Sequence, residues 1–122
     1  MPADRDDRAC LWDMLTAARA VQTFVEDRTF EDYLADVMLR SAVERQLEII
    51  GESARRVSKP LQDAHPEIPW RPTPAQRHVL AHEYGEIEHE RIWRVATVHV
   101  PELITQLAAL LPEPPPASDT EA

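Results

Sequence analysis

Residues 43–61 read Val-Glu-Arg-Gln-Leu-Glu-Ile-Ile-Gly-Glu-Ser-Ala-Arg-Arg-Val-Ser-Lys-Pro-Leu, and the spacing of their apolar side chains predicts the fold class. The apolar residues recur at steps of four, three, four, three and four, at Val43, Leu47, Ile50, Ala54, Val57 and Leu61. This spacing is typical of an amphipathic helix that faces a bundle or a dimer seam. Gly51 within the helix costs about 1 kcal/mol relative to alanine, which a close approach by another helix would explain.

Helical patterns extend on both sides of this stripe. An apolar stripe with three- and four-residue steps predicts a first helix over residues 4–26. Thr29 is a candidate N-cap for a second helical region that reaches Ser58, with a break near Asp36. A last helix is predicted over residues 88–111, kinked by Pro101.

Residues 59–72 are predicted to be a linker, because three prolines after Pro60 forbid a continuous helix. Ile68 and Trp70 are expected to anchor this linker onto the bundle. The next four residues, Thr-Pro-Ala-Gln at 73–76, form a capping-box pattern that starts another helix just before Arg77. Gly85 is expected to end that helix.

The bulk properties predict one all-α domain of four to five helices over residues 1–111, followed by a disordered, proline-rich acidic tail over 112–122. The single cysteine, Cys10, excludes an intrachain disulfide framework, and a reducing cytoplasm is the simplest setting. No apolar run approaches the roughly 20 residues that cross a bilayer. The net charge of −9 argues against a general nucleic-acid binder, so an RNA site would need a local basic patch.

The residues best suited to chemistry are Arg77 and His82, which lie about 140° apart around the predicted helix and flank one groove. Histidine titrates near neutral pH and suits general acid–base catalysis, while arginine can hold a phosphate oxygen. Such a pair can cleave RNA without a metal, through attack by a ribose 2′-hydroxyl. From spacing alone, however, an arginine and a histidine placed in this way on a helix are more often ordinary surface residues than catalytic ones.

His78 and His82 are four residues apart, a spacing that suits two ligands of one metal ion, but the sequence places no third ligand beside them.

The segment resembles the Arg-x4-His-x-Tyr signature of the HepT family within the HEPN superfamily, here Arg77, His82 and Tyr84. Three further segments are similar to the family in the right order, so that the resemblance covers nearly all of residues 4–111: 6–15 (DDRACLWDML), 45–55 (RQLEIIGESAR) and 65–70 (HPEIPW). The chain departs from many relatives at His78, where they have asparagine, and at Gly85, which follows Tyr84 directly.

The resemblance implies a HEPN-type helical bundle that forms a two-fold homodimer, and a metal-independent endoribonuclease that needs no cofactor. It implies the toxin of a type VII-like toxin–antitoxin pair in the bacterial cytoplasm, acting on transfer or messenger RNA. The implied partner is an MntA-like nucleotidyltransferase antitoxin that attaches AMP to Tyr84. Arg77 and His82 are then the catalytic residues, and His78, Arg45 and Glu48 are candidates to line the cleft.

Two alternatives stay open from the sequence. Arg45 and Glu48 are one helical turn apart and can form an intrahelical ion pair instead of lining a cleft. The protein can also be a non-catalytic docking or substrate-binding subunit of a two-component nucleotidyltransferase. An intact Arg77 and His82 favours the nuclease, because a scaffold does not need that pair.

Overall fold

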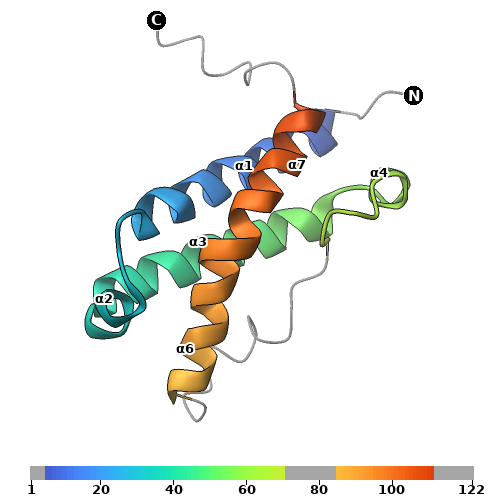
Figure 1. Ribbon diagram of the computed structural model, residues 1–122. Coiled ribbons are helices and arrows are strands. Elements are labelled where there is room, and N and C mark those ends of the chain that lie inside the picture. The colour runs from blue at the N-terminus through green and yellow to red at the C-terminus, as the bar shows by residue number, and fades with distance from the viewer. Residues whose placement is uncertain (1–4, 71–84, 112–122) are drawn as a thin grey trace, which may run out of the picture.

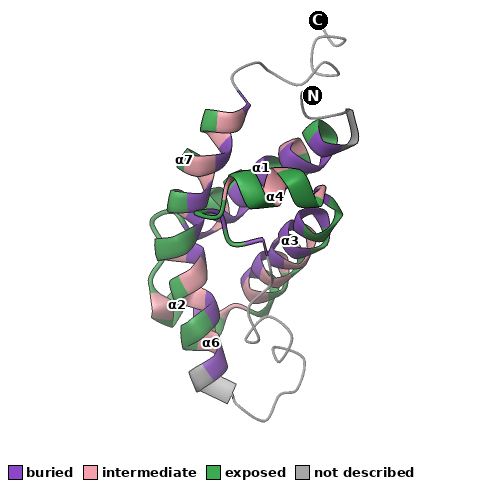
Figure 2. Cartoon of the chain, turned by 90° about the vertical axis from the view of Figure 1, so that its right-hand side faces the viewer, coloured by how far each residue is buried: buried purple, intermediate pink, exposed green. Residues whose placement is uncertain are grey.

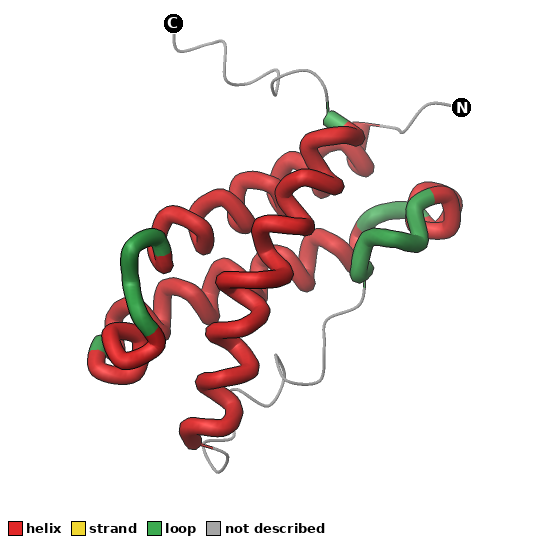
Figure 3. Tube along the Cα trace, viewed as in Figure 1, coloured by secondary structure: helices red, strands yellow, loops and turns green. Residues whose placement is uncertain are grey.

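The computed structural model describes residues 5–70 and 85–111, and every regular element in these two ranges is helical (Figure 3). The elements are α1 (Arg5–Val25), α2 (Phe30–Ala35), α3 (Val37–Arg56), α4 (Lys59–Ala64), α6 (Gly85–Arg94), the π-helical turn η1 (Val95–His99) and α7 (Val100–Leu110). The prediction of an all-α fold is therefore confirmed. None of the described helices is both long and apolar enough to span a bilayer.

The core of the bundle forms where α1 and α3 lie side by side in opposite directions and the column α6–η1–α7 crosses them (Figure 1). The buried residues, purple in Figure 2, follow the sides of these helices that face one another. They include Leu11, Met14, Leu15 and Val21 on α1, Val43, Leu47, Ile50 and Ala54 on α3, and Val100, Leu103 and Leu107 on α7. The predicted stripe on α3 is thus the core-facing side of the helix.

Side chains cap the starts of α2 and α3 and separate the two helices. Thr29 Oγ1 accepts a hydrogen bond from the Asp32 amide at 3.0 Å, and Asp32 Oδ2 accepts one from the Thr29 amide at 2.9 Å. Asp36 then caps α3 by accepting the Leu39 amide at 3.1 Å. The predicted cap at Thr29 and the predicted break near Asp36 are both confirmed, because these short polar side chains satisfy amides that a helix start leaves unpaired.

A buried carboxylate joins the first turns of α1 to the residues that follow α3. Asp7 is only 4% exposed, and its two oxygens accept hydrogen bonds from the Ser58 amide at 2.8 Å and the Ser58 hydroxyl at 2.6 Å. The two residues are 51 positions apart in the sequence. This contact fixes which end of α1 lies against which end of α3.

The predicted linker over 59–72 is wrong in its first half, because Lys59–Ala64 form α4. Pro60 lies in the first turn of α4, where no intrahelical amide bond is required, and the other prolines come after the helix. Leu61 therefore belongs to α4, and the apolar stripe crosses the helix break at Val57.

The second half of the linker is anchored as predicted. Ile68 and Trp70 are 2% and 8% exposed and belong to the core cluster. The Trp70 indole N–H donates to the His65 carbonyl at 2.9 Å, and the Gln106 amide on α7 donates to the Glu67 carbonyl at 3.2 Å. These bonds hold the linker against the bundle.

The C-terminal column α6–η1–α7 contains one irregular turn, which lies close to Pro101. The described part of α6 includes Gly85 and therefore reaches three residues before the predicted start at Glu88. The helix that Gly85 was expected to end lies outside the described residues. Where a kink at Pro101 was predicted, the structure has a π-helical turn that ends at His99, two residues before the proline, and in which the Val100 amide donates to the Val95 carbonyl. Proline offers no amide to the carbonyl four residues earlier, so the ladder shifts there.

We predict that Asp7→Ala lowers the free energy of unfolding by about 2 kcal/mol, because charge-assisted hydrogen bonds are lost and the Ser58 amide loses its acceptor. Urea denaturation followed by circular dichroism measures this change. Asp13→Ala, which removes an exposed carboxylate from the same helix, is the matched control and should change stability little. Equal stability of the two variants would contradict the assigned role of Asp7.

Candidate functional site

The four residues of the predicted signature, Arg77, His78, His82 and Tyr84, lie outside the described residues. The described chain ends at Trp70 before this segment and resumes at Gly85 directly after Tyr84. The described residues that adjoin the signature in the sequence are therefore the linker that ends at Trp70 and the start of α6.

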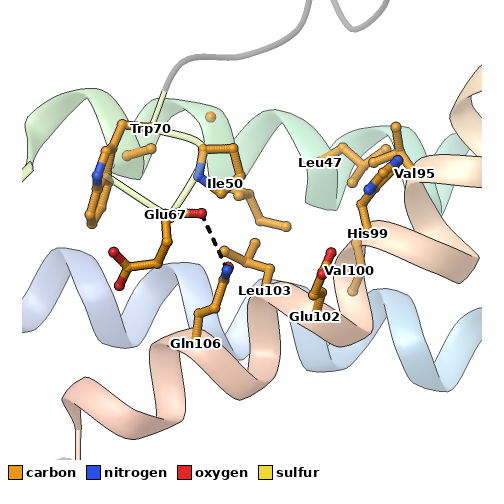
Figure 4. A pocket seen from close by; sticks show the side chains of 13 residues that line it. Leu47, Ile50, Glu67, Trp70, Val95, His99, Val100, Glu102, Leu103 and Gln106 are labelled. Atoms are coloured by element: carbon orange, nitrogen blue, oxygen red, sulfur yellow. Dashed lines mark hydrogen bonds between the residues drawn. The ribbon is translucent and has the colours of Figure 1, made fainter. Parts of the chain in front are cut away.

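A groove of about 400 Å³ lies between α3 and η1–α7, and the linker closes one end of it (Figure 4). It is lined by Leu47, Ile50, Gly51, Ala54, Glu67, Pro69, Trp70, Val95, His99, Val100, Glu102, Leu103 and Gln106. Gly51 and Ala54 are small, so the α3 wall is shallow beside them. Trp70 stands at one end of the groove, and Leu47 and Val95 stand at the other (Figure 4).

The polar side chains of the groove come mainly from the linker and α7. Glu67, His99, Glu102 and Gln106 contribute them, and the lining contains no lysine or arginine. The groove thus combines apolar walls with two carboxylates. This charge disfavours a phosphate and favours a basic or neutral occupant.

A second feature, a buried aromatic cluster, lies where α2, α3 and α6 meet. Tyr33 is fully buried, with its ring centroid 5.2 Å from Trp93 and 6.0 Å from His89, and it also stacks on Phe30 at 6.4 Å. Its hydroxyl has no hydrogen-bond partner among the described residues. Burial, and secondarily the Glu44 carboxylate, raises the pKa of the Tyr33 phenol, so the phenol stays neutral at physiological pH.

Glu44 on α3 is the acidic neighbour of this cluster. Burial raises the pKa of the Glu44 carboxyl, the Glu48 carboxylate adds to the increase, and Arg40 opposes it. The sequence analysis did not single out Tyr33 or Glu44. The signal that was available is the Glu44–Glu48 pair, since like charges four residues apart on a helix repel each other.

Arg45 and Glu48 form an ion pair on the surface of α3, with Arg45 Nη1 3.2 Å from Glu48 Oε1. Their side chains are 61% and 40% exposed. The ion-pair interpretation is therefore confirmed. Neither residue lines the groove, and a place for them at the edge of a catalytic cleft stays a prediction.

Cys10 and the three tryptophans have structural places in the bundle. Cys10 and Trp70 are buried in the core, and Trp12 and Trp93 pack against it. Within residues 5–70 and 85–111, no three histidine, cysteine, aspartate or glutamate side chains are grouped as metal ligands would be.

The helical bundle and the sequence around it place the chain among the HEPN ribonucleases. Residues 14–110 match the family model described as Ribonuclease HepT-like. A Methanocaldococcus jannaschii protein named "Putative RNase" is 33% identical over 99 residues, which are 81% of this chain and 91% of the relative. "Probable ribonuclease HepT" of Thermococcus cleftensis is also 33% identical over 99 residues, covering 81% and 90% of the two chains. No solved structure matches the chain significantly.

The chain therefore belongs to the HepT-like ribonuclease family of the HEPN superfamily. The match spans most of the helical domain and includes the residues of the signature, Arg77, His82 and Tyr84. The resemblance inferred from the ordered motifs is confirmed.

We predict that Glu44→Gln gains stability relative to the wild type as the pH rises from about 4 to 7. A carboxyl with a raised folded-state pKa favours folding when protonated, and that contribution is lost as the pH rises through the folded-state pKa. Glutamine keeps the neutral form at every pH. Denaturation of both proteins at pH 4 and pH 7 tests this, with Glu52→Gln at an exposed position of α3 as the control. If the wild type instead became more stable relative to Glu44→Gln as the pH rises, the raised pKa of Glu44 would be contradicted.

Proposed function

We propose that this chain is a metal-independent endoribonuclease and the toxin of a toxin–antitoxin pair in the bacterial cytoplasm, with Arg77 and His82 as its catalytic residues. The observation that carries the proposal is the match to the HepT-like ribonuclease family over residues 14–110, which includes Arg77-x4-His82-x-Tyr84. The substrate is RNA, either transfer RNA or messenger RNA.

The proposed reaction uses the ribose of the substrate as the nucleophile. The 2′-oxygen attacks the adjacent phosphorus, the bond from phosphorus to the 5′-oxygen breaks, and a 2′,3′-cyclic phosphate forms. His82 takes the proton of the 2′-hydroxyl as a general base or gives a proton to the leaving 5′-oxygen as a general acid. Arg77 stabilises the negative charge that develops on the phosphoryl oxygens. DNA lacks the 2′-hydroxyl and resists this route.

A homodimer would help an acidic protein to bind RNA. The chain carries a net charge of −9, and the groove lining contributes two carboxylates. A two-fold axis duplicates every residue near it, so two copies of Arg77 would form one local basic site. We therefore propose a two-fold dimer with the signature segments near the axis, where His78, Arg45 and Glu48 are candidates for the rim.

Tyr84 is the proposed site of control by a partner. A nucleotidyltransferase antitoxin related to MntA would transfer AMP from ATP, so that the Tyr84 oxygen bonds to the α-phosphorus and pyrophosphate leaves. The modification adds bulk and negative charge two residues from His82, which opposes the binding of an RNA phosphate.

The catalytic proposal is tested by incubating the purified chain with total RNA in excess EDTA. We expect cleavage by the wild type and a loss of at least about 100-fold in Arg77→Ala and His82→Ala, since general acid–base groups contribute 10²–10⁴-fold. Arg19→Ala and His65→Ala, at an exposed position of α1 and in the linker, are matched controls that should cleave like the wild type.

Two results would overturn the catalytic proposal. One is equal cleavage by His82→Ala and the wild type. The other is no cleavage, and no growth defect on expression, by an unmodified dimeric wild type, which would support the alternative of a docking subunit for a nucleotidyltransferase.

The AMP proposal is tested by incubating the chain with the nucleotidyltransferase from the adjacent gene and ATP labelled at the α-phosphate. We expect one AMP per chain, on the peptide that contains Tyr84, together with loss of RNA cleavage. The chain has only two tyrosines and Tyr33 is fully buried, so Tyr33→Phe should keep the label and Tyr84→Phe should lose it. Label retained in Tyr84→Phe would refute this site.

A further inference from the structure

Exposed basic side chains gather at the end of the bundle where α1 begins, α3 ends and α4 follows (Figure 1). The hydrogen bonds from Ser58 to Asp7, at 2.8 and 2.6 Å, hold these elements together. Consecutive Cα atoms are about 3.8 Å apart, so residues within three positions of Asp7 or Ser58 lie within about 12 Å of this contact. We call the group the basic end, and its members are Arg8 on α1, Arg55 and Arg56 on α3, and Lys59 on α4.

The cations of the basic end are available to a ligand. Its three arginines form no ion pair within residues 5–70 and 85–111. Lys59 pairs with Asp63 at 2.9 Å, but both side chains are well exposed, and such a surface pair contributes little, so Lys59 can exchange its partner for another anion. Most arginines elsewhere in the described ranges are already engaged: Arg28 with Asp36, Arg45 with Glu48, Arg91 with Glu88, and Arg40 with the main-chain carbonyls of Tyr33 and Leu34.

The carboxylates closest to these arginines leave them exposed to solvent. Asp7 is only 4% exposed, and its oxygens accept the hydrogen bonds from Ser58. Glu52 lies one helical turn before Arg55 and Arg56 and is exposed, but it forms no ion pair with either arginine. An anionic ligand therefore meets these arginines without first displacing a carboxylate of the described chain.

Complementing helix dipoles explains only part of this group. Arg55 and Arg56 lie in the last turn of α3, where a cation is favourable. Arg8 is the fourth residue of α1, close to the positive end of that helix dipole, where a cation is unfavourable. Cations collected from three elements suit a ligand with repeated negative charges, and the phosphodiester backbone of a nucleic acid is such a ligand.

We infer that the basic end binds the phosphate backbone of the RNA substrate through residues that take no part in the cleavage chemistry. The inference rests on the proposed function for the choice of RNA among anionic ligands. A chain of net charge −9 repels RNA unless positive charge is concentrated locally, and the basic end supplies such a place. Arginine suits this role because its planar guanidinium can donate two parallel hydrogen bonds to a phosphate. Contacts of this kind position a strand without reading its bases.

The experiment measures binding of a fluorescently labelled, single-stranded 2′-O-methyl RNA by anisotropy at several salt concentrations. This probe keeps the phosphates, and its methylated 2′-oxygens cannot act as nucleophiles. We expect the double variant Arg55→Gln/Arg56→Gln to bind about tenfold more weakly than the wild type. The slope of log K against log salt should fall by about 1.4, since each phosphate contact on a single strand contributes about 0.7.

Two control variants separate a local site from net charge and from folding. Arg19→Gln/Arg94→Gln removes two exposed arginines of α1 and α6 that also have no ion pair in the described ranges, and it should bind the probe like the wild type. Arg55→Lys/Arg56→Lys keeps both charges and should restore most of the binding. Circular dichroism checks that each variant has native helix content.

Three results would overturn the inference. One is the absence of probe binding by the wild type, and another is equal weakening in the two glutamine double variants, which would make net charge the cause. The third is wild-type binding by Arg55→Gln/Arg56→Gln, which would leave the basic end to an acidic protein surface.

The same measurements separate this inference from the proposed function. If the wild type cleaves RNA through His82 and Arg55→Gln/Arg56→Gln binds like the wild type, the inference alone fails. If that variant loses binding as expected but the wild type does not cleave RNA, the proposed nuclease function alone fails.

Discussion

The antiparallel packing of α1 against α3 is the contact on which the other elements depend. Its seam is filled by aliphatic side chains that are almost fully buried on both helices, including Leu15 and Val43. Burying such a side chain stabilises the fold by about 1.5–3 kcal/mol each, so the seam outweighs any single polar contact. The Asp7–Ser58 hydrogen bonds close one end of the seam and set its register. The column α6–η1–α7 crosses the pair formed by α1 and α3 and packs mainly against α1 (Figure 1).

The groove follows from this arrangement. Small residues, Gly51 and Ala54, form part of its α3 wall, and Trp70 of the linker stands at one end (Figure 4). The chain leaves the described bundle at Trp70, which lines the groove, and returns at Gly85, the first described residue of α6. In the proposed function, Arg77 and His82 come from the segment between these two residues.

Much of the helical architecture could be predicted from the sequence, because it depends on local patterns. The stripe on α3, the cap at Thr29 and the break at Asp36 are local signals, and the structure has all three. The helix α4 was missed because proline was read as a breaker, although Pro60 lies in a first turn that tolerates it. The groove and the burial of Tyr33 depend on how distant helices meet, which no local pattern reports. The spacing of Arg77 and His82 is compatible with catalysis but equally with two ordinary surface residues. Only the family motifs favoured the catalytic role.

In the proposed mechanism the ribose 2′-hydroxyl of the substrate is the nucleophile, and residues of this chain activate it in place of a metal. The most direct measurement uses a short RNA that contains one mapped cleavage site, and compares it in excess EDTA with the same RNA carrying a single 2′-deoxyribose on the 5′ side of that site. We expect the all-ribose RNA to be cut with a 2′,3′-cyclic phosphate end and the deoxy-substituted RNA not to be cut at that site. Cleavage of both RNAs at equal rates, with a 5′-phosphate on the downstream product, would mean that water is the nucleophile and would contradict the proposed mechanism.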